Sequence, residues 1–134
     1  PETPGGTLER DKAAYRPASE MMPELRWSSD AVLGFVMASK GYPGSYSKGF
    51  EISGLDDALA DPSVRIYHMG TREAVEPSEL AASAKKYATA GGRVLMVVGS
   101  GKDLGEARDK ALEAVRKIRC DNLFYRTDIG HWVL

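Results

Sequence analysis

Two glycines followed by an arginine, Gly91-Gly92-Arg93, are well suited to bind an anion. Glycines leave the backbone amides uncovered, and a neighbouring guanidinium can donate several hydrogen bonds to one phosphate. A second arginine, Arg72, follows a segment that contains His68 and Thr71. If the strands before Arg72 and after Arg93 pair in antiparallel fashion, their ends converge and both guanidiniums could reach one phosphate. The alternative is a turn with a surface arginine, and the residues alone favour neither interpretation.

A glycine-rich loop over residues 39–49 could line such a site. Its glycines permit positive φ or close backbone contact, and a proline stiffens its turn. Its tyrosines could supply a packing face or a hydroxyl group. The same residues would also serve as a long connection between two strands. The members that we expect to line the site are Gly41, Tyr42, Pro43 and Gly44.

The segment Gly99-Ser100-Gly101-Lys102 follows an apolar run and precedes a helical pattern, as a phosphate-binding loop does. The complete phosphate-loop pattern requires a glycine where Met96 stands and a serine or threonine where Asp103 stands. An aspartate at the start of the helix would also repel phosphate. We therefore interpret this segment as a turn and a helix cap.

The residues that most often do chemistry are sparse in this chain. His68 and His131 lack the spacing of metal ligands, and no nucleophile-elbow sequence is present. His68 is expected to be a strand residue that could line a pocket. A single cysteine, Cys120, cannot form an internal disulfide and is expected to be structural. We predict no metal site and no catalytic residue in this chain.

The composition limits the possible partners. The chain has 134 residues, which suits one domain with a modest core. The formal net charge is −1, so no long-range field recruits nucleic acid or anionic lipid. The sequence shows no signal-peptide pattern and no apolar run long enough to span a bilayer. We therefore expect a cytoplasmic protein that binds neither nucleic acid nor membrane.

The elements that must position these residues are mostly strands. Residues 1–29, rich in proline and charge, are predicted to be a linker or N-terminal extension, with Leu25 and Trp27 as attachment points. Residues 30–134 are predicted to form the domain. Strands are expected at residues 31–38, 50–52, 64–69, 93–99 and 123–126, with a short helical turn at 55–59 and a helix at 78–87.

A longer helix is predicted over residues 103–119. Asp103 is a good N-cap and Glu106 completes a capping-box pattern. An apolar stripe at helical spacing comprises Leu104, Ala107, Ala111, Ala114, Val115 and Ile118, and we expect it to lie in the core. Strands with one long late helix predict an α+β fold with an antiparallel sheet.

Four motifs in one order resemble a known family. They are ASKGYPGSY (residues 38–46), HMGT (68–71), GGRVL (91–95) and YRTDIGH (125–131). Over about residues 25–134 the chain resembles the C-terminal domain of the glycinamide ribonucleotide synthetases. It departs from that family in an alanine-rich stretch inserted between Thr71 and Gly91, and residues 1–24 match poorly.

The resemblance implies a half-barrel-like antiparallel sheet with one long flanking helix, related to the rudiment single-hybrid motif. It also implies an ATP-grasp ligase of purine biosynthesis, in which ATP activates glycine for attack by phosphoribosylamine. ATP and Mg²⁺ would bind to the N-terminal and ATP-grasp domains outside this chain, so the chain alone would be inactive and would bind neither.

The role left for this domain is to position phosphoribosylamine. The resemblance implies the same site, because related ATP-grasp enzymes of this pathway place a basic residue and an arginine at this hairpin for the substrate phosphate. The substrate-binding residues expected here are Arg93, Arg72, Gly91, Gly92, Thr71 and His68. The alternatives are a free-standing, non-catalytic domain that binds a protein partner or a phosphorylated metabolite, and a purely structural module.

Overall fold

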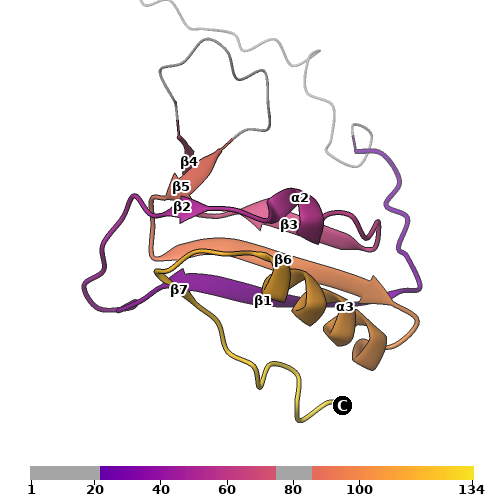
Figure 1. Cartoon of the computed structure of the whole chain (residues 1–134). Helices are drawn as coiled ribbons and strands as arrows, with labels where there is room; N and C mark the ends of the chain where they lie inside the picture. The colour runs from indigo at the N-terminus through magenta and orange to yellow at the C-terminus, as the bar shows by residue number, and fades with distance from the viewer. Residues whose placement is uncertain (1–21, 75–85) are drawn as a thin grey trace, which may run out of the picture.

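A four-stranded antiparallel sheet forms the centre of the molecule (Figure 1). The structure is a computed structural model that describes residues 22–74 and 86–134. The strands lie in the order β3-β6-β1-β7, and their bounds are Val64–His68, Arg93–Gly101, Ala31–Ser39 and Leu123–Phe124 respectively. The long central pair, β1 and β6, runs from Ala31 opposite Gly101 to Ala38 opposite Arg93.

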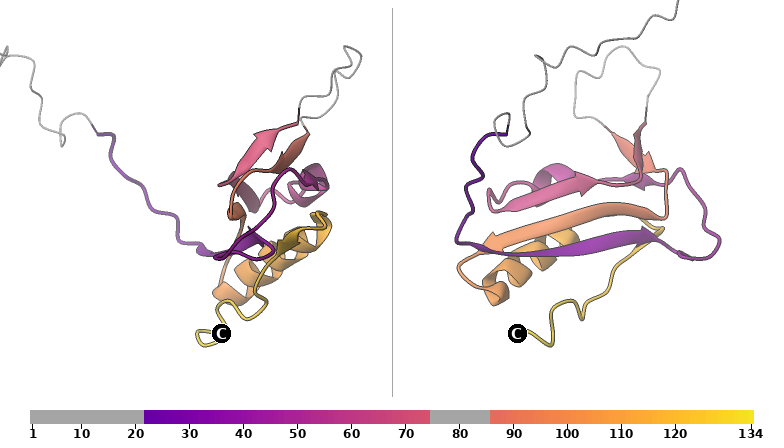
Figure 2. Two further views of the ribbon diagram at one scale, coloured as in Figure 1. Left: turned by 90° about the vertical axis from the view of Figure 1, so that its left-hand side faces the viewer. Right: turned by 180° about the vertical axis from the view of Figure 1, so that it is seen from behind.

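A smaller antiparallel sheet lies beside one end of the first. Its order is β2-β5-β4, with bounds Glu51–Ile52, Tyr87–Thr89 and Thr71–Glu73. A one-turn helix, α2 (Leu55–Ala58), joins β2 to β3. Figure 2 shows the β4–β5 hairpin rising away from the central sheet.

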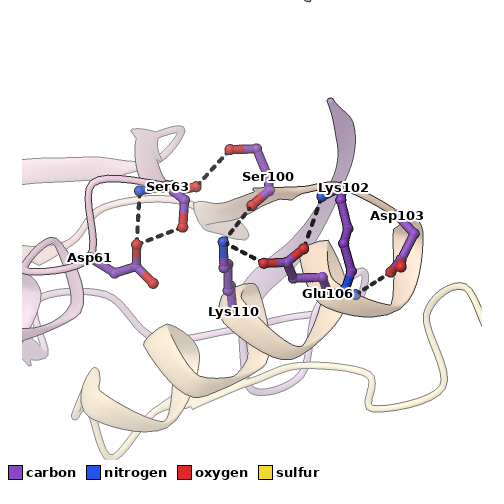
Figure 3. A network of polar contacts seen from close by, with 7 residues as sticks. All are labelled: Asp61, Ser63, Ser100, Lys102, Asp103, Glu106 and Lys110. Carbon is purple, nitrogen blue, oxygen red and sulfur yellow. Dashed lines mark hydrogen bonds and ion pairs between the residues drawn. The ribbon is translucent and has the colours of Figure 1, made fainter. Parts of the chain in front are cut away.

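The helix α3 (Leu104–Lys117) covers one face of the central sheet. It packs so closely that a Cβ atom on Gly99 of β6 would lie 2.2 Å from the carbonyl oxygen of Ala107. The Asp103 carboxylate accepts the Glu106 amide at 2.8 Å, as an N-cap does. The Glu106 carboxylate accepts the amide of Lys102, one residue before the cap, at 3.0 Å. Figure 3 shows how Lys110 then bridges Glu106 and the carbonyl of Ser100.

The core lies between this helix and the sheet. Its fully buried side chains include Phe35, Val94, Leu95 and Val97 from the sheet and Ala107 and Ala111 from α3. The apolar stripe predicted for the helix is buried except at Leu104, and the buried Leu112 was not predicted. No helix among the described residues is long and apolar enough to cross a membrane.

The predicted α+β fold with an antiparallel sheet is confirmed, and the two sheets do not close into a barrel within the described residues. The long strands and the helical turn at 55–59 lie close to where they were expected. The long helix ends at Lys117 because Ile118 has extended backbone, which lets Arg119 bridge to Ser53.

The sequence missed β4 and β5. Most of the helix expected at 78–87 falls on residues 75–85, outside the described part of the chain. At its last residue that prediction is wrong, because Tyr87 pairs with Ile52 and Glu73 in the small sheet. The last strand is also shorter than expected and ends at Phe124. Residues 22–30 form neither helix nor strand, and Leu25 and Trp27 in this segment are exposed.

Candidate functional site

Three of the four motifs meet at the Ser39 end of β1. The Ser39 amide donates to the Gly92 carbonyl at 2.8 Å, and its hydroxyl donates to the Gly91 carbonyl at 2.8 Å. The Ala90 amide donates to the Gly70 carbonyl, also at 2.8 Å. The glycine-rich loop, the turn after β3 and the turn before β6 are therefore joined by backbone contacts.

The glycines at this junction allow close packing. A Cβ atom on Gly70 would lie 2.5 Å from the Arg93 carbonyl oxygen, and one on Gly91 would lie 3.2 Å from the Gly70 Cα. A Cβ atom on Gly92 would lie 2.2 Å from Cδ2 of Tyr42. Tyr42 thus supplies a packing face, with its ring against the glycine turn.

The loop itself is shaped by two glycines with positive φ. Gly41 has φ 100° and Gly49 has φ 91°, whereas Gly44 needs no such conformation. A side chain on Gly41 would also meet the Ser45 carbonyl oxygen at 2.2 Å. The Tyr42–Pro43 peptide bond is cis. The loop residues expected to line the site thus adjoin the glycine turn through Tyr42.

The two arginines lie on different sheets. The strands β3 and β6 do pair in antiparallel fashion, with His68 opposite Leu95, so this condition for convergence is met. Arg93 opens β6, while Arg72 lies in β4 opposite Ala88. The Arg72 Nη2 atom would lie 3.4 Å from a Cβ atom on Gly49, so its guanidinium is at the end of the glycine-rich loop. Both arginines are exposed, and their joint binding of one anion stays a prediction.

His68 and Thr71 lie together at the edge of this junction. The His68 Nδ1 and the Thr71 hydroxyl are 2.8 Å apart, and the His68 ring contacts the Tyr87 ring at a tilt of 43°, with centroids 4.5 Å apart. The imidazole is exposed, as the last residue of β3. These contacts fix the orientation of the imidazole.

The sequence missed two buried polar residues that organise the junction. Ser39 and Thr89 are both 0% exposed. The Thr89 hydroxyl accepts the Phe50 amide at 3.1 Å, and the Gly49 amide donates to the Thr89 carbonyl at 2.7 Å. Ser39 and Thr89 therefore hold the two ends of the glycine-rich loop against the segment that leads to Arg93. The sequence signal that could have identified Ser39 is its position directly after the apolar run at residues 31–38.

The fourth motif, residues 125–131, lies elsewhere. Arg108 of α3 donates to the carbonyl oxygens of Thr127 at 2.8 Å and Ile129 at 3.3 Å. A Cβ atom on Gly130 would lie 2.8 Å from Leu33, near the start of β1 and away from Ser39. This motif therefore connects α3 to the start of β1.

The carboxylates with shifted pKa values also lie outside the junction. Hydrogen bonds from Ser63 lower the pKa of Asp61, and those from the Lys102 amide and Lys110 lower the pKa of Glu106 (Figure 3). The Arg126 guanidinium lowers the pKa of Asp128. Among residues 22–74 and 86–134, no group of three or more His, Cys, Asp or Glu side chains could hold a metal ion. The junction does carry the exposed guanidinium groups of Arg72 and Arg93, which are suited to bind an anion.

Comparison with known proteins identifies the domain. The family model for the phosphoribosylglycinamide synthetase C domain matches residues 32–132. The chain belongs to this family. It is 47% identical over 108 residues to the phosphoribosylamine–glycine ligase of Halalkalibacterium halodurans, a match that covers 81% of this chain and 23% of that protein. It is 43% identical over 125 residues to the ligase of the same name from Rhizobium meliloti, covering 93% of this chain and 24% of that protein.

A solved structure supports the same assignment. The C domain is similar to part of the crystal structure of the phosphoribosylamine–glycine ligase from Thermotoga maritima, with a TM-score of 0.54 and 33% identity. The match covers 72% of this chain and 21% of that chain. The C domain thus spans about a quarter of the length of the curated relatives that it matches.

Proposed function

We propose that this C domain is part of a phosphoribosylamine–glycine ligase and that it positions phosphoribosylamine. The family assignment and the names of the relatives support the ligase. Because the chain spans only about a quarter of those relatives, the remaining three quarters would supply the N-terminal and ATP-grasp domains. The cytoplasm remains the expected compartment.

In the proposed reaction, ATP activates the glycine carboxylate as an acyl phosphate and the amine of phosphoribosylamine then attacks it. ATP, with Mg²⁺ to screen its phosphates, would be held by the domains outside this chain. The residues of the C domain would bind and orient the ribosyl phosphate. Correct orientation removes much of the entropic barrier to a reaction between two bound substrates.

The observation that carries this proposal is the anchored glycine turn. Both carbonyls of Gly91 and Gly92 accept hydrogen bonds from Ser39, directly before Arg93 opens β6. The turn is thus fixed in place while the Arg93 side chain extends into solvent. An exposed guanidinium on a rigid backbone suits recognition of a phosphate. Arg72, Thr71 and His68 lie on the adjoining turn and strand and would complete the site.

Kinetics of Arg93→Ala in the complete ligase test this proposal. Loss of a charge-assisted hydrogen bond should cost about 1.5–3 kcal/mol. The value of kcat/KM for phosphoribosylamine should therefore fall about 10- to 150-fold, with the KM for ATP little changed. Arg116→Ala, at an exposed arginine of α3, is the matched control and should leave both values unchanged.

Equal losses for both substrates would overturn the assignment of Arg93. So would a lower melting temperature with normal kinetics, because that result describes an arginine that pairs at a domain interface. The free-standing alternative is tested at the level of the gene. It requires that no ATP-grasp domain be encoded with this domain or on a partner chain.

A further inference from the structure

The two central strands are apolar on both faces. In β1, alternate residues Leu33 and Phe35 point to α3 and are buried, yet the residues between them are also apolar or glycine. The same holds for β6, where Met96 and Val98 alternate with buried residues. An antiparallel sheet with one solvated face usually alternates apolar and polar residues, whereas strands covered on both faces are continuously apolar. The apolar residues on both faces therefore indicate that the face of the sheet opposite α3 is also covered in the complete protein.

Strand register places these side chains on one surface. Val36 lies opposite Met96, which lies opposite Tyr67 of β3, and Gly34 lies opposite Val98. We call this surface the open sheet face, and it consists of Val32, Gly34, Val36, Tyr67, Met96 and Val98. Two of its members are more than half exposed, with 57% for Val32 and 53% for Tyr67. No helix or strand of the described residues lies over it (Figure 2, right).

The opposite surface of the domain, formed by α3, exposes charged rather than apolar side chains. On α3, Asp109, Glu113 and Arg116 are exposed and charged, as expected of a helix that faces water. The rows of the open sheet face contain one charged residue, Arg65 opposite Val98, and one polar residue, Ser100 opposite Val32. Exposed apolar patches of this kind mark interaction surfaces.

We propose that the open sheet face is the docking surface for the part of the ligase that lies outside this chain. This inference rests on the proposed function, since it requires the longer polypeptide. The relatives supply that occupant, because the chain covers only 23% and 24% of their length. The segment that leads into β1 carries two further exposed apolar side chains, Trp27 at 88% and Leu25 at 65%.

The chain's own first 21 residues are a poorer occupant. Their large apolar side chains are only Leu8, Tyr15 and Met21, and the segment is rich in charge and proline. The open sheet face has six residues on three strands, so it needs a partner with a broader apolar surface than these three side chains provide. The rest of the same ligase, which makes up about three quarters of each relative, is therefore the occupant that we infer.

Cysteine labelling can test the surface directly. Val32→Cys and Tyr67→Cys would be introduced singly into the complete ligase and into this 134-residue chain, and modification by a maleimide would be followed by peptide mass spectrometry. Both cysteines should react at least tenfold more slowly in the complete ligase than in the chain. Leu59→Cys, at an apolar residue that is 46% exposed elsewhere, and Glu113→Cys are the controls and should react equally in both forms.

Each other outcome would overturn the inference. Equal labelling of the face in both forms would show that the ligase leaves it exposed. Protection in the chain that rises with concentration would identify a second copy as the occupant. Protection in the chain that is lost on removal of residues 1–21 would identify that segment. Ligase activity is measured on the same samples, so an active enzyme with a labelled face defeats this inference alone, and a protected face without activity defeats the proposed function alone.

Discussion

At the Ser39 end of β1, one amide and one hydroxyl hold both carbonyls of the glycine pair. The hydroxyl is fully buried, so no water replaces it if it is removed. An unpaired buried carbonyl costs on the order of 1–3 kcal/mol. Under the proposed function, Ser39 would therefore act on Arg93 through the backbone, as a positioning residue.

Ser39→Ala in the complete ligase should raise the KM for phosphoribosylamine several-fold while the KM for ATP stays unchanged. The matched control is Ser100→Ala, because the Ser100 hydroxyl also donates to a distant carbonyl, that of Ser63 at 3.1 Å, but at the other end of β6. The control should lower the melting temperature without changing either KM. Identical kinetic effects of the two substitutions would show that Ser39 has only a structural role.

At this scale the sequence singled out Arg93 and the glycine pair, whose role in binding stays a prediction, and it missed two buried hydroxyl residues. Arg93 and the glycine pair stand out by type and spacing. Ser39 and Thr89 do not, because a single hydroxyl beside a loop resembles any loop residue. The partner of the Ser39 hydroxyl is 52 residues away, and local pattern carries no information on such a contact.

Among the elements, α3 begins where its capping residues predicted. Asp103→Ala removes the carboxylate that accepts the Glu106 amide, so it should lower the free energy of unfolding by about 1 kcal/mol. Urea denaturation of the chain would measure this change. Asp109→Ala is the control, since that side chain is 82% exposed and lies in the body of the helix. Equal losses from both variants would contradict the cap.

The small sheet shows why other elements escaped prediction. The strands β4 and β5 have three residues each, too few to establish an alternating pattern. Alanines around Tyr87 favour helix locally, but its pairing with Ile52 and Glu73 and its ring contact with His68 determine the outcome. Tertiary contacts here override local propensity.

At the scale of the whole molecule, three carboxylates among the described residues make the free energy of unfolding depend on pH. The pKa values of Asp61, Glu106 and Asp128 are lowered from their ordinary values of 3.8, 4.5 and 3.8 by hydrogen bonds within the fold. The unfolded chain therefore binds protons before the folded one does as the pH falls. Their contribution is complete above the ordinary values and is lost as the pH falls through the lowered ones.

The melting temperature of the chain should thus be constant near pH 6 and fall progressively below about pH 4.5. Thermal denaturation followed by circular dichroism over this range would measure it. Glu106→Gln should reduce the slope, because the amide keeps the shape of the side chain but does not titrate. A melting temperature that rises toward acid pH would contradict the sign of these shifts.

The pairing of β1 with β6 also affects how the domain can be made. Ala31 pairs with Gly101, so about 70 residues must leave the ribosome before the strand finds its long partner. At roughly 5–20 residues per second, this delay lasts roughly 4–14 s. During that time a nine-residue strand that is apolar on both faces has no native neighbour in the central sheet. Nascent β1 consequently stays without its central-sheet partner until β6 has been made.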